Sequence, residues 1–245
     1  MNAATSEFEP AFILHARPYQ ETSQILEVLT DEHGRVGIVA RGARRPTSRW
    51  RSVLQPFQAV RLSWGGRGSL QTLRAAETAS REAPLQGMSL MGAFYLNELI
   101  LNFVRRGDPH PGLFMAYAQA LSELRLGDDP EPALRRFELS LLAEVGYGLN
   151  LDHDVANDVA LDPHRSYEYR IEHGPVPAEA GQGALVLSGM TLLAISRGEL
   201  SDPGVLQSAK RLLRGVLAHY LDGRTLRTRQ VLASMRRAPV AAQSS

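Results

Sequence analysis

The feature that most constrains the fold is a change of hydrophobic period near residues 80–86. Before this point short apolar runs alternate at strand spacing, as in the segment 59–64. After it, apolar residues recur at helical spacing, beginning with a run over 88–104 that is apolar nearly all round. Strands followed by helices are typical of the α+β class or of separate domains. We therefore predict a β domain over residues 1–82 and a helical domain over residues 83–240.

Five short strands are predicted in the β domain. They cover residues 11–14, 23–30, 35–41, 59–64 and 69–77. Arg17-Pro18 interrupts the first strand, and Gly65-Gly66-Arg67-Gly68 predicts a tight hairpin between the last two. Five short strands with one long connection suit a small closed or sandwich-like domain, and the oligonucleotide-binding (OB) barrel is one of the few folds of that size. The predicted fold class is a five-stranded OB-fold barrel followed by an all-helical domain.

Six helices are predicted after the β domain. They cover residues 88–104, 113–124, 132–145, 190–195, 203–220 and 226–237, and Asp202-Pro203 has the composition of a helix start. Between the third and fourth helices, residues 149–186 are polar and rich in turns, with one plausible strand at 167–171. We therefore predict an irregular insertion within the helical domain.

The charge of the chain is segregated along the sequence. The formal net charge of all 245 residues is only +1, yet residues 33–76 contain nine arginines and no Asp or Glu. A field of this sign attracts a polyanion, and nucleic acid is the obvious candidate. The preference for Arg over Lys throughout the chain fits a GC-rich genome and does not by itself indicate nucleic-acid binding. The segregation of charge is what predicts a DNA-binding surface.

The basic loop, residues 41–51, is the densest part of this stretch. It contains five arginines and Trp50, with glycine and proline that keep the backbone irregular. Arginine contacts phosphates and stacks on bases, and a tryptophan ring offers a flat stacking face. The alternative is a solvated loop with Trp50 folded back into the core. The predicted DNA contacts of the β domain are Arg35, Arg41, Arg44, Arg45, Arg49 and Arg51.

A second basic surface is predicted on the helix that follows Pro203. Lys210 and Arg214 are four residues apart and therefore share one face, with Arg211 beside them. The apolar residues of the same helix would then face inward. A solvated helix face without a ligand is the alternative interpretation of these cations.

The segment 152–164, here called the acidic segment, collects aspartates with His153 and His164. Such groups could form a metal centre, so a metal-dependent nuclease is the alternative function. The spacing matches no ligand motif, and we predict no metal and no cofactor. The chain has no cysteine, which excludes disulfides, thiolate catalysis and cysteine-type zinc sites. No catalytic motif is present, so we predict that the protein is not an enzyme; a protein-interaction scaffold with an incidental basic loop stays open.

No apolar run reaches the ~18–20 residues that a membrane-spanning helix needs. The first residues are polar and acidic and lack the basic start of a signal peptide. We therefore expect a soluble cytoplasmic protein without a membrane partner.

Two adjacent arginines lie within an apolar helical pattern at Leu134-Arg135-Arg136-Phe137. Neighbouring helix positions are ~100° apart, so at least one arginine lies near the core-facing side. One interpretation is an arginine whose aliphatic stem is buried while its charged end reaches solvent, or an internal ion pair with Glu138 or Glu144. The other is an arginine at the lip of an apolar groove, where it could receive a partner's carboxylate.

An ordered series of short segments resembles the bacterial RecO family of DNA repair proteins, from about residue 10 to residue 237. The segments are Ala11-Phe12-Ile13-Leu14-His15-Ala16-Arg17-Pro18-Tyr19, Glu21-Thr22-Ser23, Gly34-Arg35-Val36, Ala40-Arg41-Gly42-Ala43-Arg44, Gln55-Pro56-Phe57, Gly66-Arg67-Gly68, Tyr95-Leu96-Asn97-Glu98-Leu99, Leu134-Arg135-Arg136-Phe137-Glu138, Gly146-Tyr147-Gly148 and Ala209-Lys210-Arg211. No single segment is specific, but their order is.

The resemblance implies an N-terminal OB domain, a helical domain and no catalytic residues. It implies a recombination mediator that binds single- and double-stranded DNA, anneals complementary strands, joins RecR and helps RecA load onto strands coated by single-strand-binding protein (SSB). SSB ends in an acidic tail with a terminal apolar residue, so we assign Arg135 to the tail carboxylate, Arg136 as its neighbour and Phe137 to the pocket. Some relatives carry a four-cysteine zinc module in the helical domain. Residues 149–163 have no cysteine, so we expect no structural zinc and a less firmly held segment over 150–183.

Overall fold

The computed structural model describes residues 8–179 and 185–231. The chain divides into two compact units, Met1–Leu126 with Leu226–Ser245 and Gly127–Thr225. The first unit contains a barrel and two helices, and the second contains three helices and several short strands. The predicted boundary at residues 82/83 follows the change of secondary structure, whereas this division groups the first two helices with the barrel.

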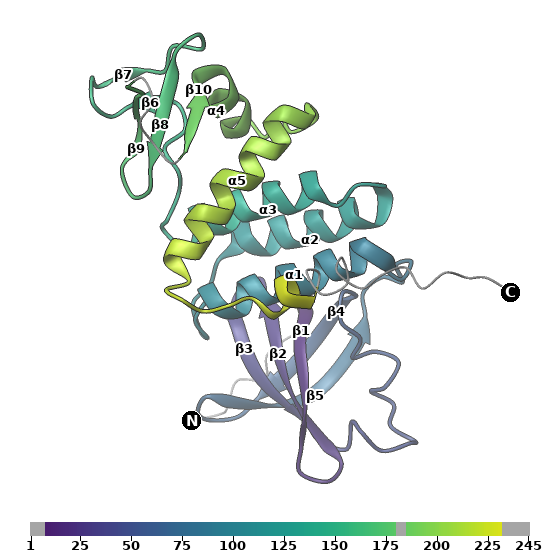
Figure 1. The fold of residues 1–245 in the computed structure, drawn as a ribbon. Coiled ribbons are helices and arrows are strands. Elements are labelled where there is room, and N and C mark those ends of the chain that lie inside the picture. Colours follow the sequence, from purple (N-terminus) through teal and green to yellow (C-terminus); the bar gives the residue numbers. More distant parts are fainter. Residues whose placement is uncertain (1–7, 180–184, 232–245) are drawn as a thin grey trace, which may run out of the picture. The chain divides into compact units, whose positions relative to one another are not determined.

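Five strands close into a barrel in the order β1-β2-β3-β5-β4, so the predicted five-stranded barrel is confirmed (Figure 1). The strands are β1 (Glu9–Tyr19), β2 (Ser23–Thr30), β3 (Gly34–Ala40), β4 (Ala59–Gly65) and β5 (Leu70–Thr78). All neighbouring strands are antiparallel except β3 and β5, which pair in parallel where Gly37 lies opposite Leu70. This single parallel pairing and the β1–β4 pairing close the sheet, although the far end of β1 keeps an edge.

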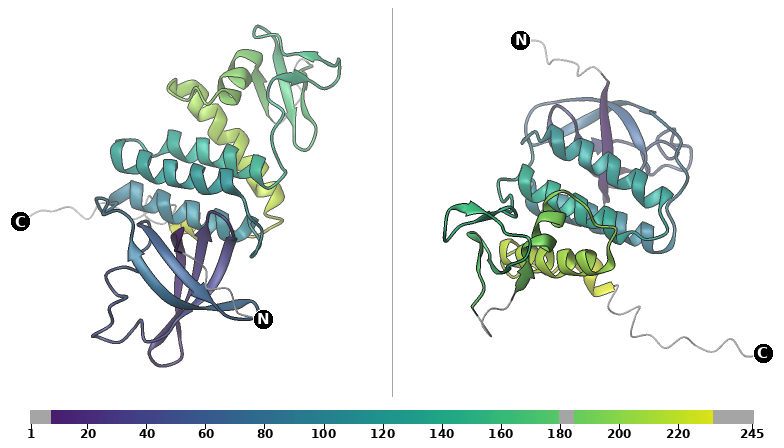
Figure 2. Two further views of the ribbon diagram at one scale, coloured as in Figure 1. Left: turned by 180° about the vertical axis from the view of Figure 1, so that it is seen from behind. Right: turned by 90° about the horizontal axis from the view of Figure 1, so that it is seen from above.

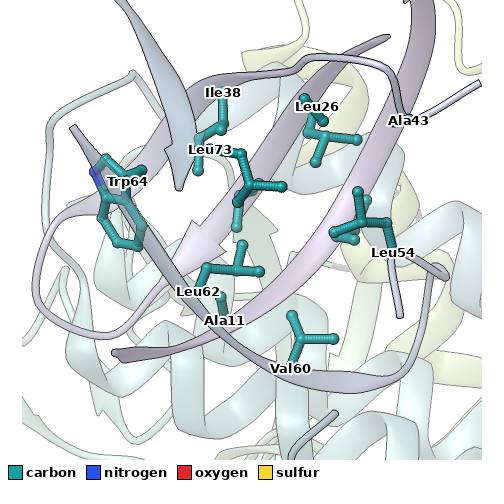
Figure 3. Packing of buried hydrophobic residues seen from close by; sticks show 12 residues of the cluster. Ala11, Leu26, Ile38, Ala43, Leu54, Val60, Leu62, Trp64 and Leu73 are labelled. Atoms are coloured by element: carbon teal, nitrogen blue, oxygen red, sulfur yellow. The ribbon is translucent and has the colours of Figure 1, made fainter. Parts of the chain in front are cut away.

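Alternating apolar residues from all five strands fill the barrel (Figure 3). Ile38 and Ala40 are fully buried, while Arg35 and Val39 at the alternating positions of β3 are half-buried, as the alternation predicts, and exposed Arg41 follows the strand. Two residues of the connection between β3 and β4, Ala43 and Leu54, also belong to this core. The core therefore holds Ala43 near the start of the basic loop and Leu54 just beyond its end, as well as the strands.

Strand β1 is longer than predicted because it continues through Pro18. The predicted interruption at Arg17-Pro18 is wrong: both residues pair with β2, opposite Ile25 and Gln24. Strand β4 pairs with β1 only over the stretch from Glu9 to Phe12. The far end of β1 is therefore an edge, where a residue without a backbone N–H is tolerated.

Helices α1 (Gly87–Phe103) and α2 (Pro111–Leu126) pack together, and α1 lies across the barrel (Figure 2). Buried Asn97 of α1 connects three elements. Its amide nitrogen donates to the carbonyl of Leu14 in β1 at 2.8 Å, and its oxygen accepts from the Tyr117 hydroxyl of α2 at 2.5 Å. Burial raises the pKa of Tyr117 above its ordinary value, so the hydroxyl stays protonated as a donor. A satisfied buried amide of this kind fixes how the helices meet the barrel.

The second unit contains α3 (Glu131–Glu144), α4 (Gly189–Ser196) and α5 (Pro203–Tyr220). Asp202 caps α5 by accepting from the backbone N–H of Val205 at 2.9 Å, as the Asp-Pro pair predicts. Leu213 and Leu217 of α5 are fully buried, and α5 packs against α3 and α4. The apolar stripe of α5 therefore forms the centre of this unit.

The stretch between α3 and α4 contains short strands rather than a single one. The strands are β6 (His153–Asp154), β7 (Val159–Ala160), β8 (Ser166–Arg170), β9 (Gly174–Pro177) and β10 (Val186–Ser188). Strand β8 confirms the strand predicted at 167–171. The other four were not predicted, because each is too short to show a period of its own. They form a three-stranded sheet in the order β10-β8-β9 and a β6–β7 pair.

The last predicted helix, 226–237, is described only in part. Residues 227–231 are helical, and the remainder of the predicted range lies outside the described residues. The Glu98 carboxylate of α1 accepts from the backbone N–H groups of Arg227 and Thr228 and from the Thr228 hydroxyl. This carboxylate thus caps the first turn of the final helix. Among the described residues, no helix is long and apolar enough to cross a membrane.

Candidate nucleic-acid interface

The basic loop projects from the barrel beside the hairpin between β1 and β2 (Figure 1). Gly42 opens it in a left-handed conformation (φ 67°), which a glycine adopts without strain. The backbone N–H of Arg44 then donates to the carbonyl of Thr22 at 2.9 Å. A series of turn hydrogen bonds follows, ending at the buried Leu54. The loop is irregular but is anchored at both ends and against the neighbouring hairpin.

All five arginines of the basic loop are exposed. They are Arg41, Arg44, Arg45, Arg49 and Arg51. Within the described part of the chain, no carboxylate lies at salt-bridge distance from any of their guanidinium groups. Uncompensated exposed guanidinium groups on an anchored backbone are suited to phosphate contacts.

Arg44 and Arg49 have additional contacts inside the loop region. Arg44 donates to the carbonyl oxygens of Gln20 and Glu21 at 3.4 and 3.3 Å, so it also holds the β1–β2 hairpin. The Arg49 guanidinium lies 4.2 Å from the centre of the Trp50 ring. Trp50 is half-buried and packs against the barrel core. Trp50 therefore matches the alternative interpretation, in which the ring folds back onto the core, better than that of a free face for base stacking.

Arg35 is placed differently from its predicted role as a DNA contact. Its side chain is only 17% exposed, and it donates to the carbonyl of Leu101 in α1 at 2.7 Å. Glu27 lies 3.6 Å away and also pairs with Arg106. Burial lowers the pKa of Arg35, against the opposing effect of Glu27. This arginine joins the barrel to α1, and a local sequence pattern could not reveal a partner 66 residues away.

Three further arginines of the acid-free stretch are exposed on the barrel but were not predicted as contacts. Arg61 pairs with Glu77 at 3.1 Å, whereas the other two have no carboxylate partner among the described residues. Arg67 lies in the β4–β5 hairpin, and Arg74 lies on β5 with its guanidinium against Gly65. A Cβ atom at Gly65 would come within 2.5 Å of that guanidinium. The absence of acids from residues 33 to 76 was the available signal for all three residues.

The three predicted cations of α5 are exposed on one face, opposite the buried leucines. Lys210 pairs with Glu131 of α3 at 2.5 Å, and Arg211 donates to the carbonyl of Val186 at 3.0 Å. Arg214 is exposed without such a contact among the described residues. The predicted face exists, but two of its three cations already serve the internal structure of this unit.

Arg135 does not lie at the lip of a groove, which corrects the predicted placement. It is 6% exposed and pairs with Glu138 at 2.7 Å and with Glu131 at 3.3 Å. This is the internal ion pair held as the alternative. Phe137 is 1% exposed and belongs to the core, while Arg136 is half-buried. A partner's carboxylate would have to displace Glu138 to reach Arg135, so these residues do not form a ready receptor.

Two of the four carboxylates of the acidic segment, those of Asp154 and Asp162, hold its own backbone, and a third, that of Asp158, contacts the His153 ring at 2.9 Å. Buried Asp154 accepts from the backbone N–H groups of Ala156 and Asn157 and from the Asn157 side chain at 2.9–3.3 Å. Burial alone raises the pKa of Asp154, but these hydrogen bonds outweigh it, and the pKa lies below the ordinary value. Asp162 likewise accepts from the N–H of His164.

A potential metal cluster appears elsewhere in the described residues. It consists of Glu9 at the start of β1 and of Glu32 and His33 in the β2–β3 turn. Glu9 already accepts from the backbone N–H groups of Glu32 and His33 and contacts the His33 ring at 2.7 Å. These contacts explain the cluster as a turn cap, and the acidic segment contributes nothing to it. The nuclease alternative therefore gains no support from the geometry.

Two protein-family models match the chain. "Recombination protein O N terminal" matches residues 6–81, and "Recombination protein O C terminal" matches residues 86–230. The chain belongs to the RecO family. It is 47% identical to the DNA repair protein RecO of Nitrosospira multiformis over 228 residues, which cover 92% of this chain and 94% of that protein. The RecO proteins of an Azoarcus species and of Aliivibrio fischeri are 45% and 41% identical, over 93% and 90% of this chain and 95% and 92% of theirs.

The RecO assignment agrees with the architecture described above. The N-terminal family region coincides with the closed barrel, and the C-terminal region begins just before α1. The segments on which the resemblance rested are therefore spread over both regions of the family. At this level the chain is a DNA repair and recombination protein with an N-terminal barrel and a helical C-terminal region.

Proposed function

We propose that this chain is a non-enzymatic recombination mediator that binds DNA chiefly through the basic loop and anneals complementary strands. The observation that carries the proposal is the set of five exposed arginines without carboxylate partners among the described residues. Phosphate neutralisation by such groups lowers the repulsion between two strands. Base pairing between the strands would then supply the sequence specificity.

The predicted contact set narrows when the geometry is taken into account. Arg41, Arg45 and Arg51 have no second role among the described residues, whereas Arg44 and Arg49 also support the loop. Arg35 is left out because it is bound to α1. Arg214 is the best remaining candidate on α5, since Lys210 and Arg211 are engaged. The loop is the main DNA surface in this proposal, and α5 is a minor one.

The RecO relatives are DNA repair proteins by name, and membership in their family supports the mediator role. RecR, RecA and the SSB tail are the proposed protein partners, and the cytoplasm is the proposed compartment. Arg135 and Phe137 are not proposed as the SSB site, because both are occupied inside the second unit.

The test is an annealing assay with labelled complementary strands in the presence of Mg²⁺ or Mn²⁺. We expect accelerated annealing without cleavage, and at least tenfold slower annealing for Arg45→Ala/Arg51→Ala. The matched control is Arg197→Ala/Arg224→Ala, which removes the same charge from exposed positions of the other unit that likewise have no carboxylate partner among the described residues. Metal-dependent cleavage, or equal loss of annealing in both double variants, would contradict the proposal.

A further inference from the structure

A cavity of about 380 Å³ lies within the second unit, apart from the basic loop. It is lined by the segment after α3, the β8–β9 turn and the end of α5. The lining includes Tyr147, Tyr169 and Tyr220 together with Glu172 and His173. A volume of this size falls within the range of small-ligand sites.

Tyrosine rings dominate the chemistry of this cavity. Tyr147 and Tyr220 stack with centroids 4.0 Å apart and planes 14° apart. Tyr147 is 44% exposed although it is held in this stack. Burial raises the pKa of Tyr220 above its ordinary value, and Glu172 and Tyr147 raise it further. Burial likewise raises the pKa of Tyr169. Neutral tyrosine rings have electron-rich faces that attract cations.

The charges around the cavity favour the same class of ligand. Glu172 is its one lining carboxylate, and neither lysine nor arginine occurs among the lining residues. One Glu172 oxygen contacts His219 at 3.0 Å, while the other has no contact among the described residues. Glu172 adopts a left-handed backbone conformation (φ 70°), which is unusual for a residue with a side chain. The turn thus holds a carboxylate beside three aromatic rings.

Two helices end at the cavity. The α3 helix ends at Glu144, and Gly146 and Tyr147 beyond it line the cavity; α5 ends with Tyr220 in the lining. The C-terminal end of a helix carries partial negative charge and stabilises cations near it. The tyrosine rings, the Glu172 carboxylate and the two helix ends therefore all favour a cationic ligand in this cavity.

We propose that this cavity receives an arginine side chain presented by a protein partner. The planar guanidinium stacks on aromatic faces and forms paired hydrogen bonds with a carboxylate, which an ammonium does not match. The second unit carries an excess of acids over residues 127–225, so a basic partner segment is also attracted at longer range. This site differs from the basic loop in its ligand and is independent of the proposed DNA binding.

The test is an NMR titration of the full chain with a capped Gly-Arg-Gly peptide. The comparison peptide contains citrulline, which has nearly the shape of arginine without its charge. We expect shifts at Tyr147, Glu172 and Tyr220 with the arginine peptide, and at least fivefold weaker binding of the citrulline peptide. Glu172→Gln keeps a hydrogen-bonding group for His219 and should weaken arginine binding by about threefold to fivefold.

Variants of Tyr147 separate the ring from its hydroxyl. Tyr147→Phe should bind the arginine peptide as well as the parent does, whereas Tyr147→Ser should bind it about threefold to fivefold more weakly. Equal binding of both peptides, unchanged affinity in Glu172→Gln, or shifts confined to other surfaces would overturn the proposal. Free L-arginine binding more than tenfold tighter than the capped peptide would also overturn it, since the ligand would then be the amino acid and not a protein side chain.

Discussion

The basic loop and the acidic segment are both short, irregular and densely charged, yet they use their charges in opposite ways. In the acidic segment, Asp154 and Asp162 accept hydrogen bonds from the backbone of the same turns. In the basic loop, the exposed guanidinium groups of Arg41, Arg45 and Arg51 form no hydrogen bond or ion pair among the described residues, and the backbone is held by other groups. Carboxylates readily accept from nearby N–H groups, whereas a long guanidinium side chain reaches away from its own turn. A cluster of charged side chains therefore indicates a binding surface only when those side chains are not already hydrogen-bonded to the local backbone.

The largest effect is expected where a charge is fully internal. Replacing Arg135 by Met leaves the Glu138 carboxylate buried without its nearest cation. Breaking a buried pair from one side costs about 3–5 kcal/mol of unfolding free energy. Urea denaturation measures this loss.

The double variant Arg135→Met/Glu138→Leu is the control for that experiment. It removes both charges, so most of the lost stability should return. A loss below about 1 kcal/mol in the single variant would mean that the pair is not the internal contact described here.

A smaller effect is expected in the acidic segment. Asp154→Ala removes an acceptor of three hydrogen bonds and should lower the unfolding free energy at pH 7 by about 2 kcal/mol. The folded-state pKa of Asp154 is depressed, so its contribution is present above the unfolded pKa of ~3.9 and is lost as the pH falls through the folded pKa. Denaturation of both proteins between pH 7 and pH 3 should show the gap closing in acid. If the difference in unfolding free energy between the two proteins widened in acid, the pKa of Asp154 would not be depressed in the folded state.

Trp50 should contribute stability through packing. Because the ring is half-buried against the barrel core, Trp50→Ala should cost about 1–2 kcal/mol, less than a fully buried aromatic residue. Trp50→Phe keeps much of the contact and should cost less. If Trp50→Ala left stability unchanged while DNA affinity fell, the ring would be a stacking platform and not an anchor.

The smallest effect on stability is expected from the outward arginines. Arg45→Ala and Arg51→Ala should each change the unfolding free energy by no more than about 0.5 kcal/mol, since their exposed guanidinium groups form no hydrogen bond or ion pair among the described residues. Thermal melts of the two variants beside Arg44→Ala would sharpen the difference, because Arg44 bonds to two carbonyls of the neighbouring hairpin. A larger loss of thermal stability in Arg45→Ala than in Arg44→Ala would contradict this expected order.

Sequence patterns predicted the helices, the strands and the position of the basic loop well. They predicted the contacts of individual arginine side chains less well. The alternation in β3 and the Asp202 cap of α5 depend on neighbours close in sequence, so local spacing was sufficient. The contact from Arg35 to Leu101 depends on tertiary structure, as does the extension of β1 through Pro18 at an edge. The Arg135–Glu138 pair was visible as one of two interpretations. Only the burial of both side chains decided between them.

The central claim is that the basic loop carries more of the DNA contact than the α5 face. The direct measurement is the salt dependence of DNA affinity for two triple-alanine variants, one at Arg41, Arg45 and Arg51 and one at Lys210, Arg211 and Arg214. Each lost phosphate contact lowers the log–log slope by ~0.7 for single strands and ~0.9 for duplex. The loop variant should therefore lose ~2–2.7 of slope, while the α5 variant should lose ~0.9 or less, from Arg214 alone. A parental slope in the folded loop variant, or a larger loss in the α5 variant, would contradict the account.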